Sequence, residues 1–153
     1  MLHFEKLTEE TVYIASEMVN SNKEYNVLEN GCETRTEAEI REEFCSGIGE
    51  HYFIKADDTY IGLFSYLDRH DKDGYPWIGL FMIHGDYQGY GYGTMAYVEL
   101  MNWLEQKGKK ALRLAVLKNN EKGRRFWEGF SFTYVEEKTT PKGHVVDVYE
   151  KTI

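Results

Sequence analysis

Residues 77–94, WIGLFMIHGDYQGYGYGT, constrain the fold of this chain more than any other stretch. They begin as an apolar run of strand length and end in three glycines at alternate positions, Gly89, Gly91 and Gly93, directly before a helical pattern. This order predicts a strand, a glycine loop and a helix. Glycines let a backbone approach a ligand closely, and the free N–H groups at a helix N-terminus bind phosphate. The stretch therefore indicates a phosphate-binding loop, although a turn that is simply rich in glycine has the same letters.

The length and composition bound the class of protein. A chain of 153 residues is predicted to form one domain over residues 1–153. Its 42% hydrophobic and 29% charged residues are typical of a soluble globular protein. The N-terminal ten residues lack a basic region and a continuous apolar stretch, and no later segment is long enough to cross a bilayer. We expect a cytoplasmic protein with no membrane partner.

The spacing of cysteine and histidine gives no metal motif. Cys32 and Cys45 fit neither a CxxC nor a zinc spacing, so free thiols are expected. The five histidines are scattered along the chain. We therefore predict no metal site. The histidines are His3, His51, His70, His84 and His144.

The negative charge is concentrated at one end of the sequence. Residues 1–50 hold 12 glutamates and four basic residues, whereas the remaining residues carry 14 acidic and 14 basic side chains. Nucleic acid is therefore an unexpected partner. An acidic segment is most often a solvated helical face, but beside a binding cleft it would also attract cationic substrates.

The residue pattern predicts alternating groups of helices and strands. Thr36 with Glu39 forms a capping box that opens a helix through Phe44. The polar, irregular residues 21–35 predict a loop or a broken helix. The other expected helices cover residues 8–20, 94–107 and about 120–128, and the expected strands cover residues 2–7, 51–56, 60–67, 77–83, 111–117, 132–137 and 144–151.

Two motifs at this spacing resemble a known family. Gln88, Gly91 and Gly93 match the Q/R-x-x-G-x-G/A signature of the GCN5-related N-acetyltransferase (GNAT) superfamily. A later stretch resembles that family's Asn-x-x-Ala-x-x-Phe-Tyr-x-x-x-Gly-Phe helix, with Asn120, Phe126 and Phe132 in register. The resemblance covers the element order of the whole chain, and residues 78–132 carry the sequence matches.

One departure from the family pattern bears on the chemistry. Trp127 stands where the family often has a tyrosine, whose hydroxyl is thought to protonate the departing coenzyme A sulfur. An indole N–H does not titrate in this range and cannot replace that acid. Either the acid is dispensable here or the protein is not a normal catalyst. Gly123 and Ser131 replace the family's alanine and glycine, which are exchanges of one small residue for another.

The resemblance implies a fold and a cosubstrate. The implied fold is a single-domain α/β acyl-CoA N-acyltransferase fold, with a mixed, mostly antiparallel sheet of six to seven strands, about four flanking helices and splayed central strands. Acetyl-CoA is the implied cosubstrate, with its pyrophosphate over the glycine loop, its pantetheine paired like an extra strand with the central strand, and two aromatic side chains as a wall. The implied cofactor-binding residues are Phe81, Met82, Ile83, Gln88, Gly89, Tyr90, Gly91, Tyr92, Gly93, Thr94, Asn120, Phe126 and Trp127. Simple core packing is an equal explanation for the aromatic pair.

The implied reaction is attack of an amine on a thioester. An alkyl ammonium with a pKa near 10.4 is neutral in about one part in 10³ at pH 7, so its deprotonation costs on the order of 4–5 kcal/mol and calls for a base. The developing oxyanion needs a donor such as the Met82 or Ile83 N–H. His84 and Glu33 are candidate bases, although a lone histidine at a strand end is more often a surface residue; Asp68 and Tyr66 are weaker candidates. The residues expected near the acceptor are Tyr25, Glu29, Glu33 and Tyr66.

Two other functions fit parts of the sequence. Residues 91–96 also fit the G-x-G-x-x-G/A fingerprint of dinucleotide-binding oxidoreductases, but that reading needs an acidic residue at the end of the next strand, where Lys118 and Asn119 stand. The second is a non-catalytic acyl-CoA-binding module that kept the fold and lost the chemistry. We expect an N-acetyltransferase that moves an acetyl group from acetyl-CoA to a primary amine of a small cationic acceptor; a peptide acceptor and a homodimer are also compatible with the sequence. Fold and cosubstrate do not choose the acceptor.

Overall fold

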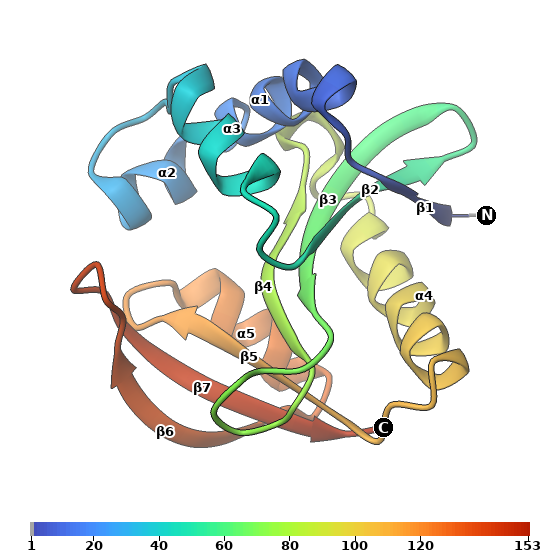
Figure 1. The fold of residues 1–153 in the computed structure, drawn as a ribbon, viewed down its shortest axis with the longest axis vertical. Helices are drawn as coiled ribbons and strands as arrows, with labels where there is room; N and C mark the ends of the chain where they lie inside the picture. The colour runs from blue at the N-terminus through green and yellow to red at the C-terminus, as the bar shows by residue number, and fades with distance from the viewer. Residues whose placement is uncertain (1) are drawn as a thin grey trace.

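The computed structural model describes residues 2–153, which form one open sheet with helices on both faces (Figure 1). The seven strands lie in the order β1-β2-β3-β4-β5-β7-β6. All neighbouring strands are antiparallel except β4 and β5, which are parallel. This mixed sheet excludes a doubly wound dinucleotide-binding fold and confirms the predicted fold class. The strands are β1 (Leu2–Lys6), β2 (Glu50–Ala56), β3 (Thr59–Leu67), β4 (Trp77–Ile83), β5 (Ala111–Leu117), β6 (Thr133–Thr139) and β7 (Val145–Thr152).

Residues 2–153 contain five α-helices, one more than expected. The additional helix is α2, which occupies the segment predicted as a loop or broken helix and ends at Gly31 in the left-handed conformation. The predicted capping box at α3 is confirmed, because Glu39 N–H donates to Thr36 Oγ1 while the Glu39 carboxylate accepts from Thr36 N–H. The helices are α1 (Val12–Asn20), α2 (Lys23–Asn30), α3 (Glu37–Cys45), α4 (Tyr92–Gln106) and α5 (Glu121–Gly129), with short 3₁₀ turns at Glu9–Thr11 and Gly85–Tyr87.

Two apolar cores cover the two faces of the sheet. One face packs against α4 and α5, where Leu100, Leu104 and Trp127 contact the apolar side of β3 and β5. The other face packs against α1 and α3 through Val12 and Ile40. On this second face no described α-helix packs against β5, β7 and β6, and α2 instead lies opposite the β6–β7 turn (Figure 1).

The central strands β4 and β5 separate shortly after they meet. They pair only at Trp77 with Arg113 and at Ile78 with Leu114. The β3–β4 register shifts directly after this point, so that Gly79 is an extra, unpaired residue in a β-bulge. A bulge bends its strand and increases the local twist. The bulge therefore turns β4 away from β5, and the predicted splay of the central strands is confirmed.

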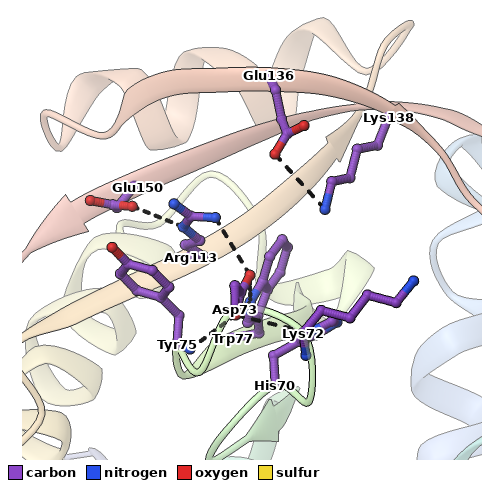
Figure 2. Close-up of polar contacts among 9 residues, drawn as sticks. All are labelled: His70, Lys72, Asp73, Tyr75, Trp77, Arg113, Glu136, Lys138 and Glu150. Carbon is purple, nitrogen blue, oxygen red and sulfur yellow. Dashed lines mark hydrogen bonds and ion pairs between the residues drawn. The ribbon is translucent and has the colours of Figure 1, made fainter.

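A polar cluster holds β4 and β5 together at their paired end (Figure 2). Arg113 on β5 donates from Nε to Glu150 Oε1 on β7 at 2.8 Å, and its Nη1 lies 3.5 Å from Asp73 Oδ2 in the β3–β4 loop. The Tyr75 ring stacks 4.1 Å from the guanidinium carbon. Arg113 N–H also donates to the Pro76 carbonyl. This Arg113 cluster (Asp73, Tyr75, Arg113 and Glu150) stabilises the end where β4 and β5 are paired and from which they diverge.

Two further findings concern membranes and metals. No helix within residues 2–153 is long and apolar enough to span a membrane. The described side chains of histidine, cysteine, aspartate and glutamate form no group of three that would hold a metal ion.

Candidate active site

A cavity of about 950 Å³ opens where β4 and β5 separate. Its volume is in the range of small-molecule and cofactor sites. Residues 78–83 of β4 and residues 114–117 of β5 form its floor. The start of α2, the loop after β4, one face of α5 and the β6–β7 turn form its walls. The cavity therefore joins the glycine loop to the acidic N-terminal segment.

The glycine loop ends the cavity at the N-terminus of α4. Gly89 and Gly91 have φ values of 86° and 85°, a region that favours glycine, and Gly91 is the N-cap of α4. Gly93 has a different role, because a Cβ there would lie 3.2 Å from Phe126 Cε1. It allows α4 to pack closely on α5. The first amides of α4 have no partner within the helix, so the loop presents N–H groups and the positive end of a helix dipole.

Gln88 and Asn22 tie this loop to the end of β4. Gln88 Nε2 donates to Asn22 Oδ1 at 2.5 Å and to the Ile83 carbonyl at 2.9 Å. Asn22 Nδ2 donates to the same carbonyl at 3.2 Å. Lys122 on α5 approaches Gln88 Oε1 to 3.3 Å and lines the cavity. The Lys122 ammonium thus lies beside the glycine loop. The sequence motif alone did not predict this positive charge.

The α5 wall is apolar and aromatic. Asn120 caps the helix by accepting from Gly123 N–H at 3.0 Å, and its side chain leaves no room for a Cβ at Gly123. Phe126 and Trp127 line the cavity next to Phe81. Trp127 is 7% exposed and also contacts aromatic rings of the core. Trp127 is therefore both a core residue and a cavity wall, so the two explanations of this aromatic pair are compatible.

The α2 wall carries two of the carboxylates that line the cavity, Glu24 and Glu29. Tyr25 and Glu29 lie one helical turn apart, and the Tyr25 hydroxyl donates to Glu29 Oε2 at 2.7 Å. Burial, reinforced by the adjacent Glu29, raises the pKa of Tyr25 well above its usual range, so its hydroxyl remains a donor. Glu24 and Leu28 also line this wall. The α2 wall thus presents two carboxylates and the Lys23 ammonium beside aromatic and aliphatic surface.

Both ring nitrogens of His84 are hydrogen-bonded within the protein. Its Nδ1 accepts from Asp86 N–H at 3.0 Å and caps the turn after β4. The proton therefore lies on Nε2, which donates to both carboxylate oxygens of Glu17 at 2.8 Å. The residue is 6% exposed and is not among the cavity-lining residues of the described chain. We therefore favour a structural role for His84 over the role of a base.

Several other predicted residues also lie outside the cavity wall. Glu33 is exposed in the loop between α2 and α3, where its carbonyl accepts from Asn26 Nδ2. Tyr66 is 1% exposed, packs on Trp103 and donates to Asp68 Oδ1. Within the glycine loop, the residues not among the described lining residues are Tyr90, Gly91, Tyr92 and Thr94. The predicted residues that do line the cavity are Tyr25, Glu29, Phe81, Met82, Ile83, Gln88, Gly89, Gly93, Asn120, Phe126 and Trp127.

Among the lining residues that sequence reasoning missed, four bear directly on the chemistry of the site. Asn22 and Lys122 lie in motif-bearing segments, but only the fold shows that both reach Gln88. Thr140 and His144 come from the β6–β7 turn, which lies beneath α2 in Figure 1. The sequence predicts the two strands on either side of this turn, but it has no signal that the turn reaches the cavity, because a polar hairpin tip has the same composition wherever it lies.

Comparison with known proteins supports the same family. The model of the acetyltransferase (GNAT) family matches residues 15–132. No curated protein matches the chain by sequence.

Solved structures match over the whole chain. An acetyltransferase from Thermus thermophilus has a TM-score of 0.84 at 17% identity, over 100% of this chain and 97% of that one. An acetyltransferase from Salmonella typhimurium that modifies the N-terminal serine of ribosomal protein L7/L12 has a TM-score of 0.78 at 17% identity, over 99% and 95%. Spermidine N-acetyltransferase from Vibrio cholerae, in complex with CoA and spermine, has a TM-score of 0.75 at 13% identity, over 99% and 95%. At these identities the likeness shows the fold.

Proposed function

Since the chain belongs to the acetyltransferase (GNAT) family, we propose that it transfers an acetyl group from acetyl-CoA to a primary amine of a small cationic acceptor. One observation carries this proposal. A single cavity is lined by an N–H-rich glycine loop with Lys122 nearby, and by the Tyr25–Glu29 pair on its α2 wall. Acyl-CoA and a cation match these two parts of the cavity by charge.

The loop end suits a pyrophosphate. Free amides at the start of α4 and the helix dipole stabilise negative charge, and the Lys122 ammonium adds to this field. The open edge of β4 beyond Ile78 offers backbone groups to an extended amide-containing arm. The side chains of Phe81, Phe126 and Trp127 then exclude water from that arm.

The α2 end suits an ammonium group. Glu29 is held by a hydroxyl that stays protonated, and Glu24 lies on the same wall. Proteins of this fold include one that modifies a protein N-terminus and one named for spermidine. The two carboxylates favour the small cationic acceptor over a neutral amine.

A screen of amines tests this function. Purified protein with acetyl-CoA is incubated with polyamines, diamines, amino acids and peptides with free N-termini, and thiol release is followed. We expect release with small cationic amines. Turnover restricted to neutral amines would contradict the acceptor class. Tight acetyl-CoA binding by calorimetry without turnover on any amine would instead support a non-catalytic acyl-CoA-binding module.

A further inference from the structure

We propose that His144, on the turn between β6 and β7, is the base that takes the proton from the acceptor ammonium, which Glu29 and Tyr25 hold from the α2 wall. This inference rests on the proposed function and assigns the proton transfer that the function requires. Its basis is that His144 is the histidine of residues 2–153 that lines the cavity.

The backbone holds His144 in place while its imidazole stays available. Its N–H donates to Thr140 Oγ1 at 3.1 Å, and its carbonyl accepts from Thr140 N–H at 2.8 Å. The four-residue span between them closes a tight turn that includes Gly143 at a φ of 87°. Within residues 2–153 the His144 ring nitrogens have no hydrogen-bond partner, and the residue is half-buried. In contrast, both ring nitrogens of His84 are engaged.

The strand register places this turn beside the C-terminal end of β5, where β4 and β5 have separated. Val146 pairs with Leu117, the last residue of β5, and Lys118 N–H donates to the Val145 carbonyl. Leu117, Val146 and His144 all line the cavity. Figure 1 shows the β6–β7 turn at the left, beneath α2, and residues of both segments line the cavity.

Other titratable groups of the cavity suit the role of base less well. Glu29 accepts a hydrogen bond from Tyr25, and a carboxylate is a weak base near neutral pH. An imidazole changes its charge between pH 5 and 8 and is the commonest general base. The described titratable or charged groups that share the cavity with His144 are Lys23, Glu24, Tyr25 and Glu29 on α2, Asp86 and Tyr87 after β4, and Lys122 on α5.

The proton balance needs no additional reactant. Neutral His144 removes one proton from the ammonium, and the amine nitrogen forms a C–N bond with the thioester carbonyl carbon. The C–S bond then breaks, and the second proton of the attacking nitrogen goes to the departing sulfur or to solvent. His144 returns its proton to solvent through the cavity mouth. The net products are an amide, a thiol and one proton.

The test compares His144→Gln with His3→Gln, a control at an exposed histidine of β1 outside the cavity lining. General base catalysis is typically worth 10²- to 10⁴-fold, so we expect kcat of His144→Gln at pH 7 to fall by about a hundredfold or more. The affinity for acetyl-CoA by calorimetry and the Tm should stay unchanged, because the imidazole makes no hydrogen bond within the described chain. The deficit should narrow at high pH, where the acceptor loses its proton without help, and added imidazole should restore part of the rate.

Two results would overturn the inference in distinguishable ways. A pH–rate profile of His144→Gln that coincides with those of wild type and His3→Gln would remove His144 from proton transfer and leave the acetyltransferase function intact. Absence of wild-type turnover with any amine would overturn the proposed function and this inference together.

Discussion

Replacing Trp127 by phenylalanine separates a packing role from a role in proton transfer. Trp127 is 7% exposed and contacts the rings of Phe81, Tyr97, Phe126 and Phe132. Truncation of a buried tryptophan to alanine costs about 3–5 kcal/mol, and phenylalanine keeps much of the contact. We therefore expect Trp127→Phe to lower the free energy of unfolding by about 1–2 kcal/mol.

This loss should appear as a modest change in Tm and kcat. A change of 1 kcal/mol lowers the Tm of a domain of this size by about 2–4 °C, so the expected shift is about 2–8 °C. Loss of a general acid would cost 10²- to 10⁴-fold in rate. Because an indole donates no proton to a leaving thiolate, we expect kcat to fall by no more than about tenfold. Thermal unfolding and steady-state kinetics with the best acceptor measure both quantities.

Trp103→Phe is the matched control. Trp103 on α4 lies in a second aromatic cluster with Phe4, Tyr52 and Phe64, and it is not among the described cavity-lining residues. Both variants should lose stability, and only Trp127→Phe should change the KM for acetyl-CoA. A kcat lowered about a thousandfold in Trp127→Phe, with normal coenzyme A affinity and a Tm close to that of the control, would refute the packing role.

Three further outcomes follow from the geometry. Gly93→Ala should weaken coenzyme A binding by displacing Phe126, whereas Gly91→Ala should cost about 1–2 kcal/mol of stability through its left-handed conformation; equal effects on calorimetric affinity and on Tm would contradict this division. Raising ionic strength should lower kcat/KM for a cationic acceptor. Glu29→Gln should lower kcat/KM at low salt, whereas the exposed control Glu33→Gln should not. An unchanged salt dependence in Glu29→Gln would contradict an electrostatic role of the α2 wall in acceptor binding. Burial opposes ionisation of Asp73, but the Tyr75 amide, the Trp77 indole, His70 and Arg113 outweigh it and lower the pKa of this carboxyl group. The ionised Asp73 carboxylate therefore stabilises the folded state above its unfolded pKa near 3.9, and this contribution disappears as pH falls through the lower folded pKa. Asp73→Asn should therefore lower Tm at pH 7 and make little difference in strong acid, and a constant deficit across pH would refute the linkage.

Local patterns predicted most of the elements, because their signals lie within a few residues. The capping box at Thr36 appears as expected, since it links a side chain to an amide three residues away, and Asn120 caps α5 through a link of the same length. The helix α2 was uncertain because residues 21–35 mix polar side chains with few apolar ones. It is stabilised by a contact with the preceding helix, in which the Asn26 side-chain amide donates to the Val19 carbonyl of α1.

The candidate site was predictable only where it follows a contiguous motif. Gln88 and the glycines stand together in sequence, and their position at the cavity follows from the strand, loop and helix order. The bulge at Gly79 had no clear signal beyond a glycine inside a strand pattern. The proximity of α2 and the β6–β7 turn depends on the twist of the sheet and on how far β4 and β5 diverge. No local sequence pattern encodes either quantity. The sequence thus predicted acidic side chains near the acceptor, but it did not predict that His144 lines the same cavity.

The replacement of a hydroxyl by an indole at Trp127 is consistent with the unequal needs of the two proton transfers. The acceptor ammonium has a pKa near 10.4, so attack at neutral pH requires a base. The leaving thiol has a pKa near 8.5, so its thiolate departs without an obligatory acid. In the proposed reaction, an aromatic α5 wall and titratable groups on α2 and the β6–β7 turn would place proton transfer at the acceptor. The apolar wall at Phe126 and Trp127 also lowers the local dielectric constant, which strengthens the attraction between Glu29 and an ammonium in the same cavity.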